Sequence, residues 1–592
     1  MKTGDGIAPG LWALNYQGVD LLDGHFKRQF DGALEYMLAL PDDDILLGFR
    51  RRAGMPHPGD ELGGWYSNDG SFDIYNWGEI GNTFGQWLSF LARAWRLTGD
   101  RRAFEKAERL MDEWAKTIAP DGYFFYSDAP NGPHYLYDKH LLGLLDVYEH
   151  MNLPRALAYL SRITDWAEKN LGRSRLPAGP NHLSFTGGDP AIRIMDNEWY
   201  TLSEGLYRAW LLTGEARYLD FARVWHYDHY WDALRRGDEE AMNGLHGYSH
   251  VNTLGGAAMA YRATGEKGYL ETLQNAYDIM KKNQLLANGG YAPAEHMANA
   301  RGSNYYAIED EPKTFEVCCG SWAVFKTVRH LIELTGEARY GDWAEAALYN
   351  AVGAALPFKD DCQRRGKTFY YSDLRLGGGR KLYFEHSFPC CSGTYPEALA
   401  EYHNLVCYAG EDALYLSQYI PSCIRSEVRG RQVELEISGE YPYGEEILLR
   451  VRAKGRFTLM LRIPSWVNPG EAALLLNGRP ADSEIAPGRW ARVEADWGGD
   501  DLVALRLPMR LRLAPIHPAY PWRTALMAGP VLLAAEGKVP QVAGDYREPE
   551  SVARALGGMR FEARTPSGDR VLFKPYLEFG EKEWATVYFD LT

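Results

Sequence analysis

The chain has 592 residues, of which 46% are hydrophobic, and a formal net charge of −15. This length predicts two to four globular domains, and the negative charge argues against nucleic acid or an anionic membrane as the main partner. The start MKTGDGIAPGLW shows no basic stretch followed by an apolar run, no segment is apolar enough to span a membrane, and seven cysteines make no disulfide scaffold, so we expect a cytoplasmic protein.

A repeated turn signal organises the first 409 residues. It is a glycine followed by an acidic residue, and it occurs at Gly99, Gly214, Gly265 and Gly336, with a degenerate member at Asn152. A glycine past one helix end and an acidic residue opening the next helix are typical of αα-hairpins. The spacings are irregular, roughly 50 to 70 residues, and longer than those of solenoid repeats. The pattern therefore predicts an (α/α)6 toroid over residues 1–409, with the ends of its inner helices around a central cavity.

After residue 410 the pattern becomes that of β structure. Segments such as VELEISGEYPYGEEILLRV, RFTLMLRIPSW and VALRLPMRLRLA alternate or run short between turn residues, which is typical of β-sandwiches. We expect the last inner helix, over 394–409, to end near Gly410. Residues 410–592 would then form one or two β-sandwich modules, split near 512, that close one end of the toroid.

Two cysteine pairs about 72 residues apart carry the clearest chemical signal. Cys318 and Cys319 follow Glu316 in TFEVCCGSW, and Cys390 and Cys391 stand in HSFPCCSGTYPE. Thiolates and carboxylates are tetrahedral zinc ligands, but this spacing is not that of common zinc ribbons. From the residues alone, core cysteines on apolar helices, a vicinal disulfide and a closed structural zinc site remain alternatives. The remaining thiols are interpreted as packing or surface groups: Cys362, Cys407 and Cys423.

These motifs resemble those of the glycoside hydrolase family 127 β-L-arabinofuranosidases. Glu316-Val317-Cys318 resembles the family's E-T-C motif and Cys390-Cys391 its C-C motif. The likeness continues along most of the chain, in GGWYSND, NWGEIGNTFGQWLSFLARAWRLTGD, YLYDKHLLGLLDVYE, YSHVNTLGGAAMAYRATG, GGYAPAEH and LRIPSWV. The resemblance implies an (α/α)6 toroid followed by β-sandwich modules, in agreement with the repeat.

Position by position, the resemblance implies a Zn²⁺ site with Glu316, Cys318, Cys390 and Cys391 as ligands. It also implies that Cys390 is the nucleophile. Zinc would remove the thiol proton, so that no separate base is needed to activate the sulfur. Cys319 stands where the family usually has a small residue, and it could replace Cys318 as the ligand.

The resemblance makes Glu295, in GGYAPAEH, the general acid/base. The sequence offers nearby acidic rivals, which are Glu309, Asp310 and Glu311. Glu295 lies 21 residues before Glu316, a longer spacing than in the family. The segment also reads PAEHMAN instead of the family's G-E-A-F, so the match contains a gap.

His140 in YDKH and His250 in YSHVNT would contact the sugar in the −1 subsite, by the same resemblance. His140 lies on an expected helix, where a packed histidine is the ordinary interpretation, and His250 could equally be structural. Glu198 and Glu204 in NEWYTLSEG stand where some relatives place a histidine. We expect both near the sugar pocket, so arabinofuranose is the family's default sugar and is not deduced from this pocket.

The leading hypothesis is a retaining, exo-acting glycoside hydrolase with a zinc-bound Cys390 thiolate, releasing β-L-arabinofuranose from plant-derived oligosaccharides or glycopeptides. Sulfur would attack the anomeric carbon while Glu295 protonates the leaving oxygen, and water would then hydrolyse the thioglycoside with net retention. The alternatives are a toroidal hydrolase or lyase that uses carboxylates, and a sugar-binding protein with a structural zinc site. The sequence predicts a carbohydrate partner, no nucleic acid and no membrane, and leaves the oligomeric state open, a homodimer included.

Overall fold

The computed structural model describes residues 10–66, 81, 83–128, 130, 132–172, 198–299, 302, 304–361 and 365–592. Within them, six inner helices form a closed ring, because each contacts the next and the last contacts the first. In ring order they are α3 (Phe84–Thr98), α5 (Pro133–Met151), α7 (Leu202–Thr213), α11 (Leu254–Thr264), α14 (Val317–Thr335) and α16 (Cys391–Val406). The predicted (α/α)6 toroid is confirmed.

Each inner helix packs against an outer helix. In the same order, the outer helices are α4 (Arg101–Ala115), α6 (Arg155–Asn170), α8 (Ala216–Val224), α12 (Lys267–Asn283), α15 (Gly341–Asn350) and α1 (His25–Ala39). Shorter helices flank the ring: α2 (Asp42–Arg52), α9 (Asp228–Arg235), α10 (Gly247–Asn252) and α13 (Asn304–Asp310). No helix in the described ranges is long and apolar enough to cross a membrane.

The repeated turn signal marks the C-terminal ends of inner helices. The glycines lie just past α3, α7, α11 and α14 with φ between 67° and 76°, and Asn152 ends α5 with φ of 55°. These left-handed conformations explain the glycines, which adopt them without a Cβ clash. At the fourth signal, Thr335 Oγ1 donates to the Leu331 carbonyl (2.6 Å) and accepts from the Glu337 amide (3.2 Å).

The last inner helix differs from the expectation. It runs over Cys391–Val406 instead of 394–409, and the chain continues as strand β6 (Cys407–Ala409), which pairs with β1 (Trp12–Ala13) and β7 (Ala413–Leu416). β-Favouring residues and two available strand partners outweigh the helical pattern at this point. The ring therefore leads directly into the β region, without a linker.

Two sheets, which share one hydrophobic core, form the first β module. The five-stranded sheet has the order β1-β6-β7-β11-β14 and the seven-stranded sheet the order β13-β12-β15-β10-β9-β8-β2. Their further strands are β2 (Val19–Leu21), β8 (Ser422–Val428), β9 (Arg431–Gly439), β10 (Glu446–Arg452), β11 (Lys454–Arg462), β12 (Ala473–Leu476), β13 (Arg479–Pro480), β14 (Trp490–Gly498) and β15 (Asp501–Arg506). Thus β1 and β2, within the range predicted as toroid, complete two sheet edges. Such short strands give no periodic signal in a sequence.

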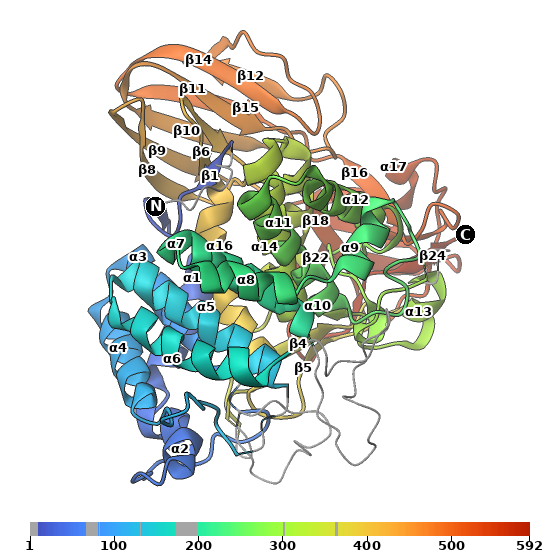
Figure 1. Ribbon diagram of the computed structural model, residues 1–592. Coiled ribbons are helices and arrows are strands. Elements are labelled where there is room, and N and C mark those ends of the chain that lie inside the picture. The colour runs from blue at the N-terminus through green and yellow to red at the C-terminus, as the bar shows by residue number, and fades with distance from the viewer. Residues whose placement is uncertain are drawn as a thin grey trace.

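A nine-stranded sheet forms the C-terminal module. Its strands are β16 (Leu511–Pro515), β17 (Arg523–Ala528), β18 (Val531–Glu536), β19 (Gln541–Val542), β20 (Arg554–Gly557), β21 (Arg560–Arg564), β22 (Arg570–Pro575), β23 (Ala585–Thr586) and β24 (Phe589–Leu591). One apolar cluster lies within the module, around Phe573 and Phe589, while another joins Leu532 and Tyr588 to Ile308 of α13. The module thus packs on the side of the helical ring (Figure 1).

The first β module lies at the end of the ring where the inner helices finish (Figure 1). Arg462, which is 0% exposed and belongs to LRIPSWV, forms ion pairs with Asp342 (2.8 Å) and Glu345 of the outer helix α15. Trp466 Nε1 donates to the same Glu345 carboxylate (2.8 Å). This motif therefore docks the β module onto the ring.

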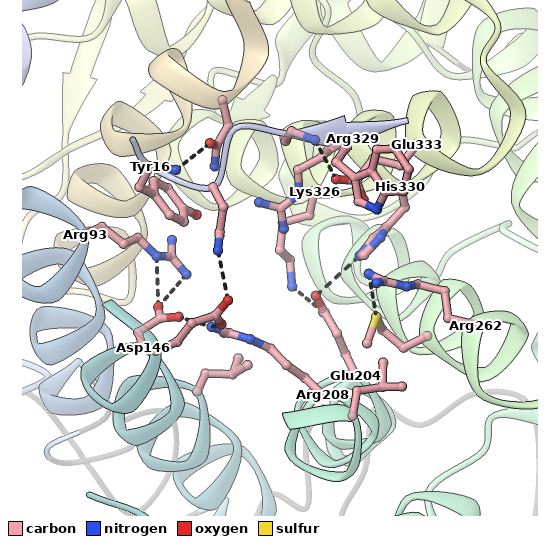
Figure 2. Close-up of a pocket in the computed structure, with 18 of the residues that line it drawn as sticks. Tyr16, Arg93, Asp146, Glu204, Arg208, Arg262, Lys326, Arg329, His330 and Glu333 are labelled. Atoms are coloured by element: carbon pink, nitrogen blue, oxygen red, sulfur yellow. Dashed lines mark hydrogen bonds and ion pairs between the residues drawn. The ribbon is translucent and has the colours of Figure 1, made fainter. Parts of the chain in front are cut away.

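The same end of the ring encloses a charged pocket of about 150 Å³ (Figure 2). Its charges are paired with one another, as in Arg93–Asp146 (2.8 Å) and Arg208–Glu149 (2.7 Å). The N-terminal segment crosses the pocket, and Asn15 Nδ2 donates to Glu149 (2.8 Å). Cationic side chains here suit the partial negative charge of converging helix C-termini. The N-terminal ends of the inner helices, at the opposite end, carry the candidate site.

Candidate active site and metal centre

Four residues meet where two inner helices begin. Three of them are predicted zinc ligands, and the other, Cys319, is the neighbour of the fourth predicted ligand. Glu316 is the last residue of β3 (Phe315–Glu316) and the N-cap of α14, and Cys319 lies in the first turn of that helix. Cys390 is the N-cap of α16 and Cys391 its first residue. One oxygen of Glu316 and the sulfurs of Cys319, Cys390 and Cys391 all lie within 4.8 Å of one another.

A small sheet fixes the approach of these two helices. Strands β3, β4 (Phe369–Ser372) and β5 (Lys381–Tyr383) form it, and Glu316 pairs with Tyr371 across the first two strands. The pairing holds the start of α14 against β4. Tyr370 and Tyr371 of β4 thereby reach the site, and the sequence analysis had assigned neither of them a role.

The structure places Cys319, and not Cys318, in the cluster. The Cys318 sulfur points to the Phe369 carbonyl of β4, 3.1 Å away, whereas the Cys319 sulfur lies 3.5 Å from Cys390 and 3.4 Å from Cys391. Successive residues of a helix point about 100° apart, and here Cys319 turns toward Cys390 while Cys318 turns toward β4. Of the two thiols between which the sequence left the choice open, the structure brings Cys319 into the cluster in place of the predicted Cys318.

Cys390 differs from the other two sulfurs of the cluster. It is 9% exposed, whereas Cys319 and Cys391 are fully buried. Hydrogen bonds from Cys319 and Cys391, and then from Tyr370 (3.3 Å), lower the pKa of Cys390 well below its usual range. Burial raises the pKa of Cys319 and Cys391. The positive end of α16 further favours a thiolate at its N-cap. Of these three cysteines, Cys390 is thus the one with a lowered pKa and with some exposed surface.

The donor set fits a tetrahedral metal ion. Glu316 Oε1 lies 3.4 Å from the Cys390 sulfur and 3.6 Å from the Cys391 sulfur. Ligands about 2.3 Å from a central zinc are about 3.8 Å apart in a tetrahedron. Glu316 Oε2 is buried and, among the described residues, has no hydrogen-bond partner. Burial, followed by Cys390, raises the pKa of Glu316, because crowded anions need a cation to ionise together. The cluster can therefore hold a divalent metal.

Glu295 lies beside this cluster on a strained turn. It ends the 3₁₀ element η3 (Pro293–Glu295), and the φ angles of Ala292, Ala294 and Glu295 are all between 53° and 65°. Left-handed backbone costs energy for residues other than glycine and often accompanies functional sites. One carboxylate oxygen of Glu295 lies within 4.8 Å of the Glu316 carboxylate, so the turn presents Glu295 to the metal cluster.

His246 and Tyr371 surround the Glu295 carboxylate. The Tyr371 hydroxyl donates to Glu295 Oε1, and His246 Nε2 lies 3.6 Å from Glu295 Oε2. Burial raises the pKa of Glu295, but His246 and then Tyr371 outweigh burial and lower it overall. Burial lowers the pKa of His246, but Glu198 (3.1 Å) and Glu295 outweigh it and raise this pKa well above the usual range. The group is a linked Glu198–His246–Glu295 chain.

Glu198 and Glu204 lie in different places, contrary to the expectation for the pair. Glu198 contacts His246 beside the cluster, whereas Glu204, in the first turn of α7, pairs with Lys326 and lines the charged pocket. Of the two, Glu198 is therefore the one that contacts the candidate site.

The two predicted sugar contacts lie in well-packed surroundings. His140 on α5 stacks among aromatic rings, with Trp114 at 5.2 Å and Phe124 at 5.0 Å, and burial lowers its pKa to about 4. His250 on α10 contacts Tyr200, whose ring centroid is 4.6 Å away. The sugar contacts of both histidines stay predictions.

Sequence reasoning missed His246, Tyr370 and Tyr371. His246 precedes His250 by one helical turn in HGYSH, and this i, i+4 pair was a usable signal. The tyrosines lie on a four-residue strand inside a helical region, where no periodicity marks them. Two thiols lie elsewhere: Cys407 is buried in β6 and Cys423 is partly exposed in β8. Cys362 lies outside the described residues.

Comparisons with known proteins cover nearly the whole chain. The sequence profile of the GH127 β-L-arabinofuranosidase catalytic domain matches residues 18–404, and that of the middle domain of the same family matches residues 413–509. A search of curated proteins found no significant match.

Solved structures share the fold. A GH127 β-arabinofuranosidase is similar with a TM-score of 0.73 and 17% identity, over 99% of this chain and 98% of that chain. A GH127 β-L-arabinofuranosidase from Geobacillus stearothermophilus T6 has a TM-score of 0.73 and 18% identity, over 97% and 100%. A glycoside hydrolase has a TM-score of 0.69 and 15% identity, over 100% of both chains.

Proposed function

This chain belongs to glycoside hydrolase family 127, and from that premise we propose that it is a retaining, exo-acting β-L-arabinofuranosidase with a zinc-bound cysteine nucleophile. The observation that carries the proposal is the convergence of Glu316, Cys319, Cys390 and Cys391 at the starts of two inner helices. Three thiols and a carboxylate suit Zn²⁺, which takes sulfur and oxygen ligands tetrahedrally. When bound, zinc would keep the coordinating thiols deprotonated near neutral pH.

Cys390 has the surroundings of a nucleophile. It alone of the three clustered sulfurs has exposed surface, and Tyr370 donates a hydrogen bond to it. Its sulfur would form a bond to the anomeric carbon of the furanoside while the bond from that carbon to the leaving oxygen breaks. The covalent product is a thioglycoside on Cys390, which a water molecule then cleaves. Two inversions at the same carbon retain its configuration.

Glu295 is the proposed general acid/base. It must be protonated to donate to the leaving oxygen, yet its pKa is lowered by His246 and Tyr371. His246 resolves this conflict, because it is the protonated partner, 3.6 Å away, that can pass its proton to Glu295. Glu198 contacts the other nitrogen of the His246 imidazole, Nδ1, and holds the imidazole in place. In the second step Glu295 accepts a proton from the attacking water.

The test is hydrolysis of p-nitrophenyl β-L-arabinofuranoside, beside the corresponding pyranosides, under reducing conditions. Cys390→Ala should lower kcat/KM by about a thousandfold or more, since it removes the nucleophile. Cys407→Ala, which truncates a buried thiol in β6, is the matched control and should retain activity. A strong chelator should inactivate the enzyme, and Zn²⁺ should restore it. Substantial turnover by Cys390→Ala would instead favour catalysis by carboxylates, and binding without any turnover would favour a sugar-binding protein.

A further inference from the structure

An aromatic surface joins α13 to the C-terminal module. The rings of Tyr305 and Tyr520 stack at 4.1 Å, Tyr306 meets Tyr305 at 5.1 Å, and Trp522 meets Tyr520 at 5.8 Å. Tyr306 is 62% exposed and Trp522 39% exposed. We call these four residues the aromatic platform. A contiguous group of exposed aromatic rings marks a surface that binds a ligand or a partner.

Arg523 holds the platform rigid. Its guanidinium lies 3.8 Å from the Tyr305 ring centroid and pairs with Glu309 of α13 (2.9 Å) and Asp590 of β24 (2.9 Å). Arg523 itself is only 4% exposed. The Arg523 side chain thus connects α13, strand β24 and the Tyr305 ring. A platform fixed in this way loses little conformational entropy when a ligand binds.

Helix α13 links the platform to the turn that carries Glu295. Helix α13 contacts η3, the turn that carries Glu295. Between them lies a surface pocket of about 490 Å³, lined by Pro293 and His296 on one side and by Ala307, the neighbour of Tyr306, on the other. Figure 1 shows α13 beside the C-terminal module, toward the end of the molecule where β4 and β5 lie. Helix α13 therefore carries two platform tyrosines and one wall of a pocket whose other wall includes Pro293, in the Glu295 turn, and His296, which follows that turn.

We propose that the aromatic platform binds the neutral glycan chain on the leaving-group side of the cleaved bond. Pyranose and furanose rings present C–H faces that stack on aromatic rings, while tyrosine hydroxyls meet sugar hydroxyls. The proton donor Glu295 must face the leaving oxygen, so a chain that leaves past Glu295 enters the pocket next to it. The acidic run at 309–311 beside the platform disfavours polyuronates, which are anionic. The inference rests on the proposed function for the identity of the cleaved bond.

The first test compares long and short substrates. The ratio of kcat/KM for an arabinofuranosyl oligosaccharide to that for the p-nitrophenyl furanoside is measured in the wild type and in Tyr306→Ala and Trp522→Ala. Loss of one stacking ring should lower this ratio by about tenfold. Tyr546→Ala, which removes a ring of 38% exposure on another loop of the same module, should leave the ratio unchanged. An unchanged ratio in both platform variants would overturn the proposal.

A binding test separates this proposal from the proposed function. Native gel electrophoresis through neutral arabinan or through polygalacturonate needs no turnover. Arabinan should retard the wild type and Tyr546→Ala, and retard Tyr306→Ala and Trp522→Ala less. If arabinan retards a protein that hydrolyses no furanoside, only the proposed furanosidase activity is refuted. Three outcomes of the gel would refute glycan binding by the platform: stronger retardation by polygalacturonate, equal retardation of all variants, or no retardation at all. A wild-type dimer that Tyr306→Ala converts to a monomer would refute it as well.

Discussion

At the residue scale, Tyr370 and Tyr371 serve the two proposed catalytic groups separately. They are consecutive residues of β4, so their side chains leave the strand in different directions. The Tyr370 hydroxyl reaches the Cys390 sulfur (3.3 Å), and the Tyr371 hydroxyl donates to Glu295. One strand thus tunes the nucleophile and the acid/base together, and it does so from outside the helical ring that carries the cysteines.

Tyr371→Phe should move the alkaline limb of the kcat/KM profile to higher pH. The hydroxyl stabilises ionised Glu295 and so lowers the pKa of Glu295. Removing it raises that pKa, and Glu295 then keeps the proton needed for the first step up to a higher pH. Tyr383→Phe in β5, whose hydroxyl donates only to the Pro357 carbonyl, is the matched control. A limb that stays in place or moves to lower pH would argue against Glu295 as the acid.

The sequence located the candidate metal cluster but could not show which way its side chains point. Both cysteine pairs and Glu316 were recognisable from residue type and family likeness. The choice between Cys318 and Cys319 depends on the rotation of α14 against β4, which a sequence does not express. The same holds for Glu204, whose type and position suggested the sugar pocket although its side chain pairs with Lys326 in the charged pocket.

At the element scale, the turn η3 stores backbone strain next to Glu295. Ala294→Gly should stabilise the protein by about 1 kcal/mol, because glycine adopts its φ of 53° without a Cβ clash. The measurement is the urea midpoint of unfolding. Ala346→Gly, in the right-handed helix α15, is the control of opposite sign and should destabilise by about 1 kcal/mol. A lower midpoint for Ala294→Gly would mean that the turn is not strained.

Elements with repeated chemistry were predictable, and short isolated ones were not. Gly99, Gly214, Gly265 and Gly336 end helices as the sequence indicated, because a left-handed helix end demands glycine. The strands β3, β4 and β5 have two to four residues each and depend on distant partners. Their existence follows from tertiary pairing, so local patterns did not reveal the sheet that presents Tyr370 and Tyr371.

At the scale of the whole molecule, the first β module and the helical ring share a buried charge network. Arg462→Met should destabilise the protein by about 3–5 kcal/mol, because it leaves the buried Glu345 carboxylate without its cation. Thermal unfolding followed by calorimetry would measure the effect. Arg450→Met removes an exposed pair with Asp500 from the same module and should change little. Equal effects of the two substitutions would show that Arg462 does not dock the module.

The two ends of the helical ring differ because all inner helices run in the same direction. All inner helices begin at one end, where the thiol cluster lies, and finish at the end covered by the first β module. Helix N-termini favour anions, so the arrangement supports thiolates and carboxylates at the end where the inner helices begin. The repeat predicted the ring, and the strand pattern after residue 410 predicted the β modules. Neither pattern predicted that β1 and β2 would return to the β sheets, because only the folded chain brings them to those edges.

The most direct test of the account is zinc K-edge X-ray absorption on protein purified with reductant. The account predicts one zinc ion with three sulfur ligands at about 2.3 Å and one oxygen ligand at about 2.0 Å. Cys318→Ala should keep this spectrum, whereas Cys319→Ala should lose one sulfur ligand or the metal. A protein that binds no zinc, or a zinc shell of nitrogen and oxygen alone, would contradict the account.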